Sequence, residues 1–78
     1  MITVKLYGLL RLDSGIRQLR LEAANVKEVF RALLAETDRI TKADLDGCVI
    51  LINGKQGSRR SQLTDGDQVV LLSPVAGG

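Results

Sequence analysis

Apolar and polar residues alternate along the first stretch of the chain. Ile2, Val4 and Leu6 take every second position, and the positions between them are polar or aromatic. A period of two is typical of a strand with one buried face. Turn-forming residues then predict a hairpin loop over residues 8–15. A second strand is expected at about residues 16–22.

A helical period replaces this alternation further along the chain. Asn25 is a suitable N-cap, and Glu28, three residues later, completes the spacing of a capping box. Apolar side chains then recur at helical intervals along one stripe. They are Val26, Val29, Phe30, Leu33 and Leu34. The pattern predicts one amphipathic helix, followed by a polar loop over residues 37–47 with room for one helical turn.

The second half of the chain has the pattern of further strands. Residues 48–52 are all apolar and end at an Asn-Gly pair, which is a strong signal for a two-residue hairpin. Residues 55–56 would form a very short return strand at an edge. The last strand is expected at residues 68–73, and Pro74 ends it because proline has no N–H to donate.

These elements predict an α+β fold. A single amphipathic helix can cover one face of a sheet, so the simplest assembly is a mixed sheet of four to five strands packed on one helix. This architecture is the β-grasp, or ubiquitin-like, fold. We expect residues 1–73 to form the β-grasp domain and residues 74–78 to form a flexible tail.

Two of the predicted strands are apolar on both faces, and one helix cannot cover both. The exposed set could be shielded by loops and long side chains, since exposed apolar atoms are common. Alternatively it could form a flat surface for a protein partner, which is the interpretation we favour. The sequence does not decide which face is exposed. The partner-binding residues that we predict on these strands are Val70, Leu72, Ile50 and Ile52.

Composition narrows the range of functions. The chain has 78 residues, of which 45% are hydrophobic, so we expect one small globular domain. Cys48 has no second cysteine to pair with, and a zinc site is improbable without histidine. A net charge of +2 and two aromatic residues argue against nucleic-acid binding. With neither a signal-peptide pattern nor a membrane-spanning run, we expect a cytoplasmic protein that binds no membrane.

The Gly77-Gly78 pair suggests the chemistry. Without β-carbons, these residues form a slim segment that can thread into the active site of another protein. A carboxylate is a poor electrophile and needs activation, for example by ATP as an acyl-adenylate. A sulfur nucleophile would then yield a thiocarboxylate, and a lysine amine would yield an isopeptide bond. Neither route needs a catalytic side chain here, so we expect a carrier and not an enzyme.

Three segments of the chain form an ordered set: Leu51-Ile52-Asn53-Gly54-Lys55, Leu63-Thr64-Asp65-Gly66-Asp67-Gln68-Val69 and Ser73-Pro74-Val75-Ala76-Gly77-Gly78. Together they resemble the MoaD family, which is the small subunit of molybdopterin synthase. The neighbouring ThiS family of thiamin-pathway sulfur carriers also ends in Gly-Gly after a similar strand. The resemblance covers nearly the whole chain and is tightest over the last sixteen residues.

The resemblance implies a sulfur carrier with two protein partners. An E1-like enzyme of the MoeB/ThiF type would use ATP to adenylate Gly78, which then receives sulfur as a thiocarboxylate. The tail, with Pro74, Val75, Ala76 and Gly77, would insert into a large catalytic subunit of the MoaE type. That subunit would move the sulfur onto a pterin precursor of the molybdenum cofactor. The chain itself would bind no cofactor.

The branch of the family is a separate question. Chain length and Pro74 favour the molybdopterin branch, although Ser73 stands where that branch commonly has a first proline. The alternatives are a ThiS-like carrier for thiamin thiazole synthesis and a ubiquitin-like protein modifier.

Three other features have a plain structural interpretation beside a functional one. Cys48 is expected to be a small buried hydrophobe, although a redox role is conceivable. The Arg59-Arg60 pair is expected in a solvated loop, with an acidic partner surface as the alternative. The segment 65–67 resembles part of a metal loop but lacks further oxygen ligands, so we expect a turn.

Overall fold

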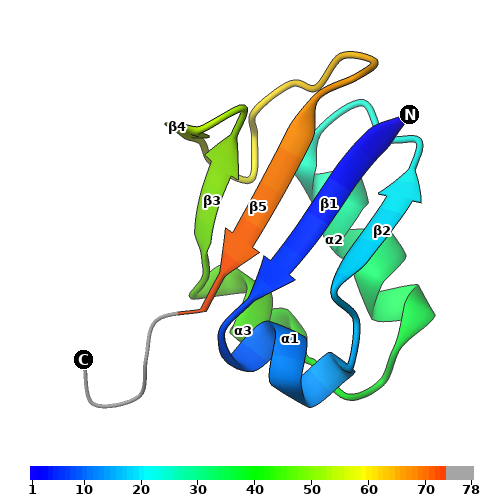
Figure 1. Cartoon of the computed structure of the whole chain (residues 1–78), viewed down its shortest axis with the longest axis vertical. Helices are drawn as coiled ribbons and strands as arrows, with labels where there is room; N and C mark the ends of the chain where they lie inside the picture. The colour runs from blue at the N-terminus through cyan, green and yellow to red at the C-terminus, as the bar shows by residue number, and fades with distance from the viewer. Residues whose placement is uncertain (74–78) are drawn as a thin grey trace.

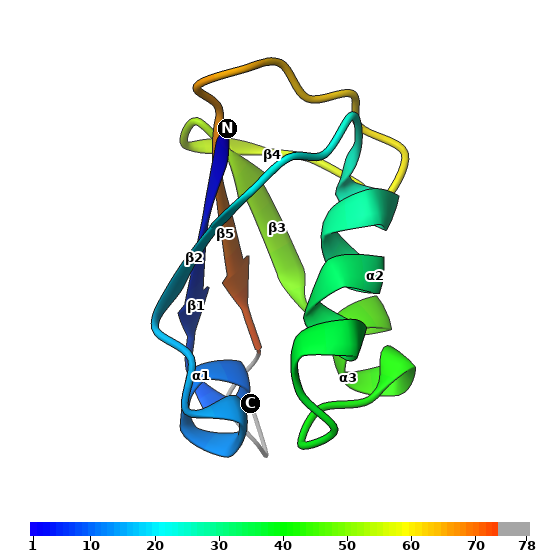
Figure 2. The ribbon, with the colours of Figure 1, turned by 90° about the vertical axis from the view of Figure 1, so that its right-hand side faces the viewer.

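Five strands form one mixed sheet in the computed structural model, which describes residues 1–73 (Figure 1). The strand order across the sheet is β2-β1-β5-β3-β4. A long helix, α2, lies across one face of the sheet (Figure 2). In chain order the elements are β1 (Ile2–Tyr7), α1 (Leu9–Ser14), β2 (Gln18–Leu21), α2 (Val26–Glu36), α3 (Lys42–Asp46), β3 (Val49–Ile52), β4 (Lys55–Gln56) and β5 (Gln68–Leu72). The predicted α+β, β-grasp architecture is confirmed.

The centre of the sheet is the parallel pair of β1 and β5. Their register runs from Thr3 opposite Gln68 to Tyr7 opposite Leu72, and all the other strand pairs are antiparallel. Every second residue of both strands is buried under α2. These residues are Ile2, Val4, Leu6, Val69 and Leu71. The first and last strands of the domain therefore share one core.

Helix α2 starts where the sequence predicts. The side chain of Asn25 accepts a hydrogen bond from the backbone N–H of Glu28 at 2.9 Å. The carboxylate of Glu28 in turn accepts one from the N–H of Ala24 at 2.7 Å. The predicted stripe is buried, except that Leu34 lies at its margin and is partly exposed. The capping interactions fix the residue at which the helix starts. The buried stripe fixes which side of the helix faces the sheet.

Helix α1 is absent from the sequence-based prediction, which places a hairpin loop over residues 8–15. The turn-forming residues Ser14 and Gly15 instead end a short helix. The Ser14 hydroxyl donates to the carbonyl of Leu10 at 2.6 Å, and the N–H of Gly15 donates to the carbonyl of Arg11 at 2.9 Å. Leu10 is buried in the core, so one apolar contact fixes the helix in place. The loop prediction was therefore wrong.

The remaining elements lie close to their predicted ranges. Helix α3 is the single helical turn for which the predicted loop had room, and it carries a capping box between Thr41 and Asp44. The Asn-Gly pair forms the β3–β4 turn, with Asn53 at a φ of 52°. Strand β2 is shorter than predicted. Among residues 1–73, α2 is the longest helix, and none of the helices has the length and apolarity to cross a bilayer.

Two leucine substitutions test whether α2 supplies the core. Leu33→Ala removes a side chain with no exposed surface and should lower the free energy of unfolding by about 3 kcal/mol. Leu12→Ala is the matched control, because Leu12 is also helical but 76% exposed, and its effect should stay within about 0.5 kcal/mol. Urea unfolding at equilibrium measures both. Equal losses would contradict the packing described here.

Candidate functional site: the open sheet face and the end of β5

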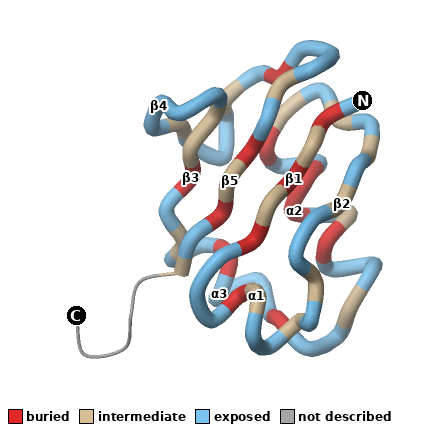
Figure 3. Tube along the Cα trace, viewed as in Figure 1, coloured by how far each residue is buried: buried red, intermediate tan, exposed pale blue. Residues whose placement is uncertain are grey.

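The face of the sheet opposite α2 is open, and side chains of three neighbouring strands meet on it. Residues paired across strands project to the same face. Leu72 lies between Tyr7 and Val49, and in the next row Val70 lies between Lys5 and Leu51. Figure 3 shows buried positions along β5 alternating with intermediate or exposed ones. We call the five apolar or aromatic side chains the open-face patch: Tyr7, Val49, Leu51, Val70 and Leu72.

The open-face patch is exposed enough to serve as a contact surface. Tyr7, Leu72 and Val49 are 41%, 39% and 38% exposed, and the other two members are half-buried. Lys5 adds a positive charge within the row of Val70. An apolar cluster of this kind on a small protein is typical of a protein-binding surface.

Two of the predicted partner-binding residues are not on this face. Ile50 pairs with Leu71 and Ile52 pairs with Val69, so both side chains point toward α2. Ile50 is buried, and Ile52 packs against the core. The prediction that they lie with Val70 and Leu72 was therefore wrong. Val49 and Leu51 take their place, because strand β3 faces the helix with its even-numbered residues.

The end of β5 is tied to helix α1. The hydroxyl of Ser73 accepts a hydrogen bond from the backbone N–H of Leu10 at 3.2 Å. This N–H belongs to the first turn of α1, where no intrahelical acceptor exists. Gly8, at the N-cap position, has no side chain to supply one. Ser73 thus caps α1 from the other end of the chain and fixes the point at which residues 74–78 begin.

Gly8 makes this close approach possible. Its φ is 66°, and a β-carbon there would lie 2.8 Å from the Ser73 hydroxyl and 2.9 Å from the Ser73 carbonyl oxygen. Both distances are too short for any side chain. The turn between β1 and α1 therefore requires glycine for its conformation and for its contact with the end of β5.

Comparison with known proteins shows the family to which this chain belongs. The sequence matches the ThiS family over residues 4–78. The chain belongs to the ThiS family. It is thereby one of the ThiS/MoaD-type ubiquitin-like sulfur carriers, which are small proteins that act with partners. A comparison with curated proteins finds no match.

Solved structures support the fold and the family. Subunits 1 and 2 of molybdopterin-converting factor from Helicobacter pylori form a complex in which one chain is 31% identical to this one, with a TM-score of 0.68. That match covers 99% of this chain and 97% of the other. SAMP1 from Haloferax volcanii shares the fold, with a TM-score of 0.85 at 24% identity and coverage of 99% and 98%. A chain of the BexX/CysO complex from Amycolatopsis orientalis also shares the fold, with a TM-score of 0.76 at 22% identity and full coverage of both chains.

The tail residues predicted from the ThiS/MoaD resemblance lie outside the described residues. They are Pro74, Val75, Ala76, Gly77 and Gly78. Of the described residues predicted to bind partners, Val70 and Leu72 lie together on the open face. Tyr7, Val49 and Leu51 complete the surface, and the alternation of β1 with the register of β3 on β5 is the signal that identifies them.

Asn53 and Asp67 join the β3–β4 turn to the start of β5. The Asn53 amide donates to the Asp67 carboxylate at 2.9 Å, and its oxygen accepts from the N–H of Gln68 at 2.9 Å. The backbone N–H of Thr64 also donates to Asp67 at 2.9 Å. These bonds lower the pKa of the Asp67 carboxyl, the Thr64 N–H most and the Asn53 amide next. The predicted turn at residues 65–67 is therefore held by the carboxylate of Asp67.

The one cysteine among residues 1–73 is not arranged as a nucleophile. The Cys48 thiol donates to the carbonyl of Leu45, and burial raises its pKa to about 11. It stays protonated at neutral pH and is a poor nucleophile. Within residues 1–73, no three acidic, cysteine or histidine side chains are grouped as a metal site.

Two glycine substitutions test the tie between Ser73 and α1. Gly8→Ala and Gly15→Ala both place alanine at a positive φ, which costs about 1–2 kcal/mol each. At Gly15 a β-carbon meets nothing within 4 Å, whereas at Gly8 it meets Ser73. We expect Gly8→Ala to lose more stability in urea and to shift the amide NMR signal of Leu10. If Gly15→Ala shifts that signal as much, Ser73 is not fixed by Gly8.

The Asn53–Asp67 bond predicts a pH effect. The pKa of Asp67 is lower when folded than its ordinary value of 3.8, so its stabilisation is complete above that value and is lost as the pH falls through the folded pKa. Asn53→Gly keeps the positive φ but removes the amide, and should raise the pKa of Asp67 partway toward 3.8. Asn25→Gly, which removes an amide elsewhere, should leave it unchanged. An NMR titration of the Asp67 carboxyl carbon decides between these outcomes.

Proposed function

We propose that this chain carries sulfur on the carboxylate of Gly78 for molybdopterin synthesis. The carboxylate attacks the α-phosphate of ATP on an E1-like enzyme, and pyrophosphate leaves. A sulfur nucleophile attacks the resulting acyl-adenylate, and AMP leaves. The product is a thiocarboxylate, whose sulfur passes to a pterin precursor on a large catalytic subunit. In each of these steps this chain is a substrate of a partner enzyme and supplies no catalytic side chain.

One observation supports the carrier role above the others: the open-face patch adjoins the exit point of the tail. Leu72 is a central member of the patch, and Ser73, the next residue, is bonded to α1. A partner that covers the patch therefore receives residues 74–78 from a fixed position. Five residues in an extended conformation span up to about 17 Å. That reach suits a buried active site in the partner.

The molybdopterin branch is supported by the similarity to subunit chains of molybdopterin-converting factor. The Helicobacter pylori chain is 31% identical and was solved as a complex of subunits 1 and 2. We propose a large subunit of the same kind as the acceptor-side partner. An E1-like adenylating enzyme is the proposed activating partner. We place the protein in the cytoplasm, where both reactions would have ATP.

A protein modifier is the second candidate. Small archaeal modifier protein 1 from Methanosarcina acetivorans is 26% identical, with a TM-score of 0.83 and coverage of 99% of this chain and 95% of the other. A modifier shares the adenylation step, but a lysine amine of a target protein then displaces AMP. The two roles therefore diverge after activation. A thiamin-pathway carrier would also form the thiocarboxylate and would differ only in the molecule that accepts the sulfur.

Intact-mass spectrometry tests the carrier role. The protein is incubated with ATP, sodium sulfide and the host's E1-like enzyme. We expect a mass increase equal to one oxygen replaced by sulfur, located at Gly78 by fragmentation. Addition of one alanine after Gly78 should abolish the increase. An unchanged mass with an enzyme that still forms AMP would contradict a sulfur carrier, and lysine adducts in a denaturing pull-down would then favour a modifier.

The same assay tests the open-face patch. Leu72→Glu places a charge at its centre and should slow sulfur loading by about tenfold or more, as expected for a residue central to an interface. Leu12→Glu is the matched control, because Leu12 is exposed on α1 and outside the patch. It should load at the rate of the unmodified protein. Equal rates for the two variants would show that the enzyme binds another surface.

A further inference from the structure

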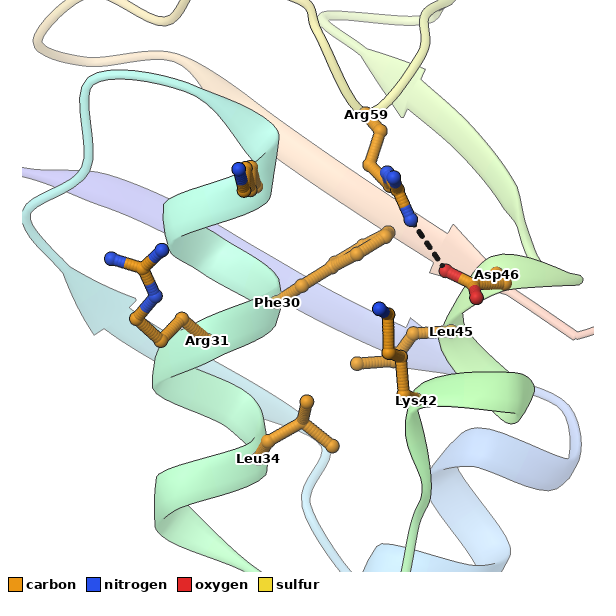
Figure 4. Close-up of a pocket in the computed structure, with 8 residues that line it drawn as sticks. Phe30, Arg31, Leu34, Lys42, Leu45, Asp46 and Arg59 are labelled. Atoms are coloured by element: carbon orange, nitrogen blue, oxygen red, sulfur yellow. Dashed lines mark hydrogen bonds and ion pairs between the residues drawn. The ribbon is translucent and has the colours of Figure 1, made fainter.

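A second recognition surface lies on the helical side of the molecule, across the sheet from the open-face patch. A pocket of about 260 Å³ opens between α2, α3 and the loop at residues 57–62. Its apolar lining consists of Phe30 and Leu34 from α2 and Leu45 from α3. Figure 4 shows the Phe30 ring reaching from α2 toward Arg59 and α3. The volume is below that of a pocket for a drug-sized ligand and suits a single apolar side chain.

The rim of this pocket is strongly basic. Four cationic side chains line it against one carboxylate, so its lining has a net charge of +3, while the whole chain has only +2. The positive charge of the protein is thus concentrated here. The cations are Lys27, Arg31, Lys42 and Arg59, and the carboxylate is Asp46.

Asp46 does not neutralise this rim. Its carboxylate accepts a hydrogen bond from Nη1 of Arg59 at 2.9 Å, and both side chains remain about half exposed. A guanidinium has five N–H donors, so Arg59 keeps donors for another acceptor. The pair fixes the Arg59 head group across the mouth of the pocket, as the dashed line in Figure 4 marks.

The loop that carries Arg59 is held in place by the start of α2. The carbonyl of Arg59 accepts from the N–H of Lys27 at 3.1 Å, and the carbonyl of Ser61 accepts from the N–H of Val26 at 3.2 Å. The Ser61 hydroxyl accepts from the N–H of Ser58 at 2.9 Å. The loop therefore uses the free N–H groups of the first helical turn. The arginines are presented by an ordered backbone.

A second hollow continues the basic surface. It has a volume of about 360 Å³ and shares Lys27 and Arg59 with the first. Its other lining residues are Asn25, Arg60 and Gln62, none of which is acidic. An apolar pocket thus adjoins a polar, cationic one, and the pair forms a short groove that we call the basic groove.

We propose that the basic groove binds an acidic peptide segment of a partner protein, with one apolar side chain in the pocket and carboxylates along the cationic rim. Charge complementarity selects this occupant. A bilayer would need apolar side chains that project, whereas Phe30 and Leu45 are recessed. A single-stranded nucleic acid would need exposed aromatic rings for stacking, and Phe30 is only 6% exposed.

This assignment gives the protein two independent contact surfaces. The basic groove and the open-face patch lie on opposite sides of the sheet, as the position of α2 in Figure 2 indicates. A partner in the groove leaves the patch and the end of β5 uncovered. The groove can therefore hold the protein while the tail is used elsewhere. The proposal does not depend on the sulfur-carrier function.

Fluorescence anisotropy with a labelled peptide tests the groove. The probe is a short peptide of glutamates around one leucine, and the comparison peptides replace either the glutamates with glutamine or the leucine with alanine. We expect the probe to bind, both comparison peptides to bind more weakly, and added salt to weaken binding. NMR shifts should map to α2, α3 and residues 57–62. Shifts confined to the open face, or no binding at millimolar peptide, would overturn the proposal.

Matched charge reversals locate the binding site. Lys27→Glu/Lys42→Glu should weaken the probe by about tenfold, because exposed charge contacts are individually modest and two are reversed. Both positions lie in first helical turns, where glutamate is compatible with folding. Arg17→Glu/Arg39→Glu makes the same change in net charge at exposed positions outside the groove and should leave binding unchanged. Equal weakening by both variants, or tighter binding of a single-stranded oligonucleotide than of the probe, would overturn the proposal.

Discussion

The parallel pairing of β1 with β5 is the interaction on which the rest of the structure depends. It joins the two ends of the domain at the centre of the sheet, and five buried side chains from the two strands lie beneath α2. Because the strands run in the same direction, the end of β5 emerges beside the end of β1. Helix α1 follows β1 directly, so its first turn is in position to receive Ser73. The exit point of the tail is thus a consequence of sheet topology.

Local signals in the sequence were enough to predict most elements. The capping residues of α2, the Asn-Gly turn and the alternation in β1 are each determined by neighbouring residues, and the structure confirms them. Helix α1 could not be predicted in this way. It has six residues, its N-cap glycine offers no side chain, and its cap is supplied by Ser73. An interaction between residues so far apart leaves no trace in a local pattern.

The error at Ile50 and Ile52 has a similar cause. A strand that is apolar on both faces carries no information about which face meets the helix, and the answer depends on its register with β5. The presence of an apolar patch could be predicted, but its two members on β3, Val49 and Leu51, could not. The basic groove was harder still, because it combines a helix, a single helical turn and an irregular loop. The Arg59-Arg60 pair was the one part of the basic groove for which the sequence analysis considered a partner surface.

The β1–β5 pair also makes the folded state cooperative. Its contacts close a loop of nearly the whole domain, so the centre of the sheet can form only once the last strand is in place. A chain with β5 displaced loses the centre of its core. It also loses the open-face patch, because β5 joins the patch residues of β1 to those of β3. There is then no intact half-domain for a partner to recognise. A partner that binds the open face would therefore bind only a chain in which β1 and β5 are paired.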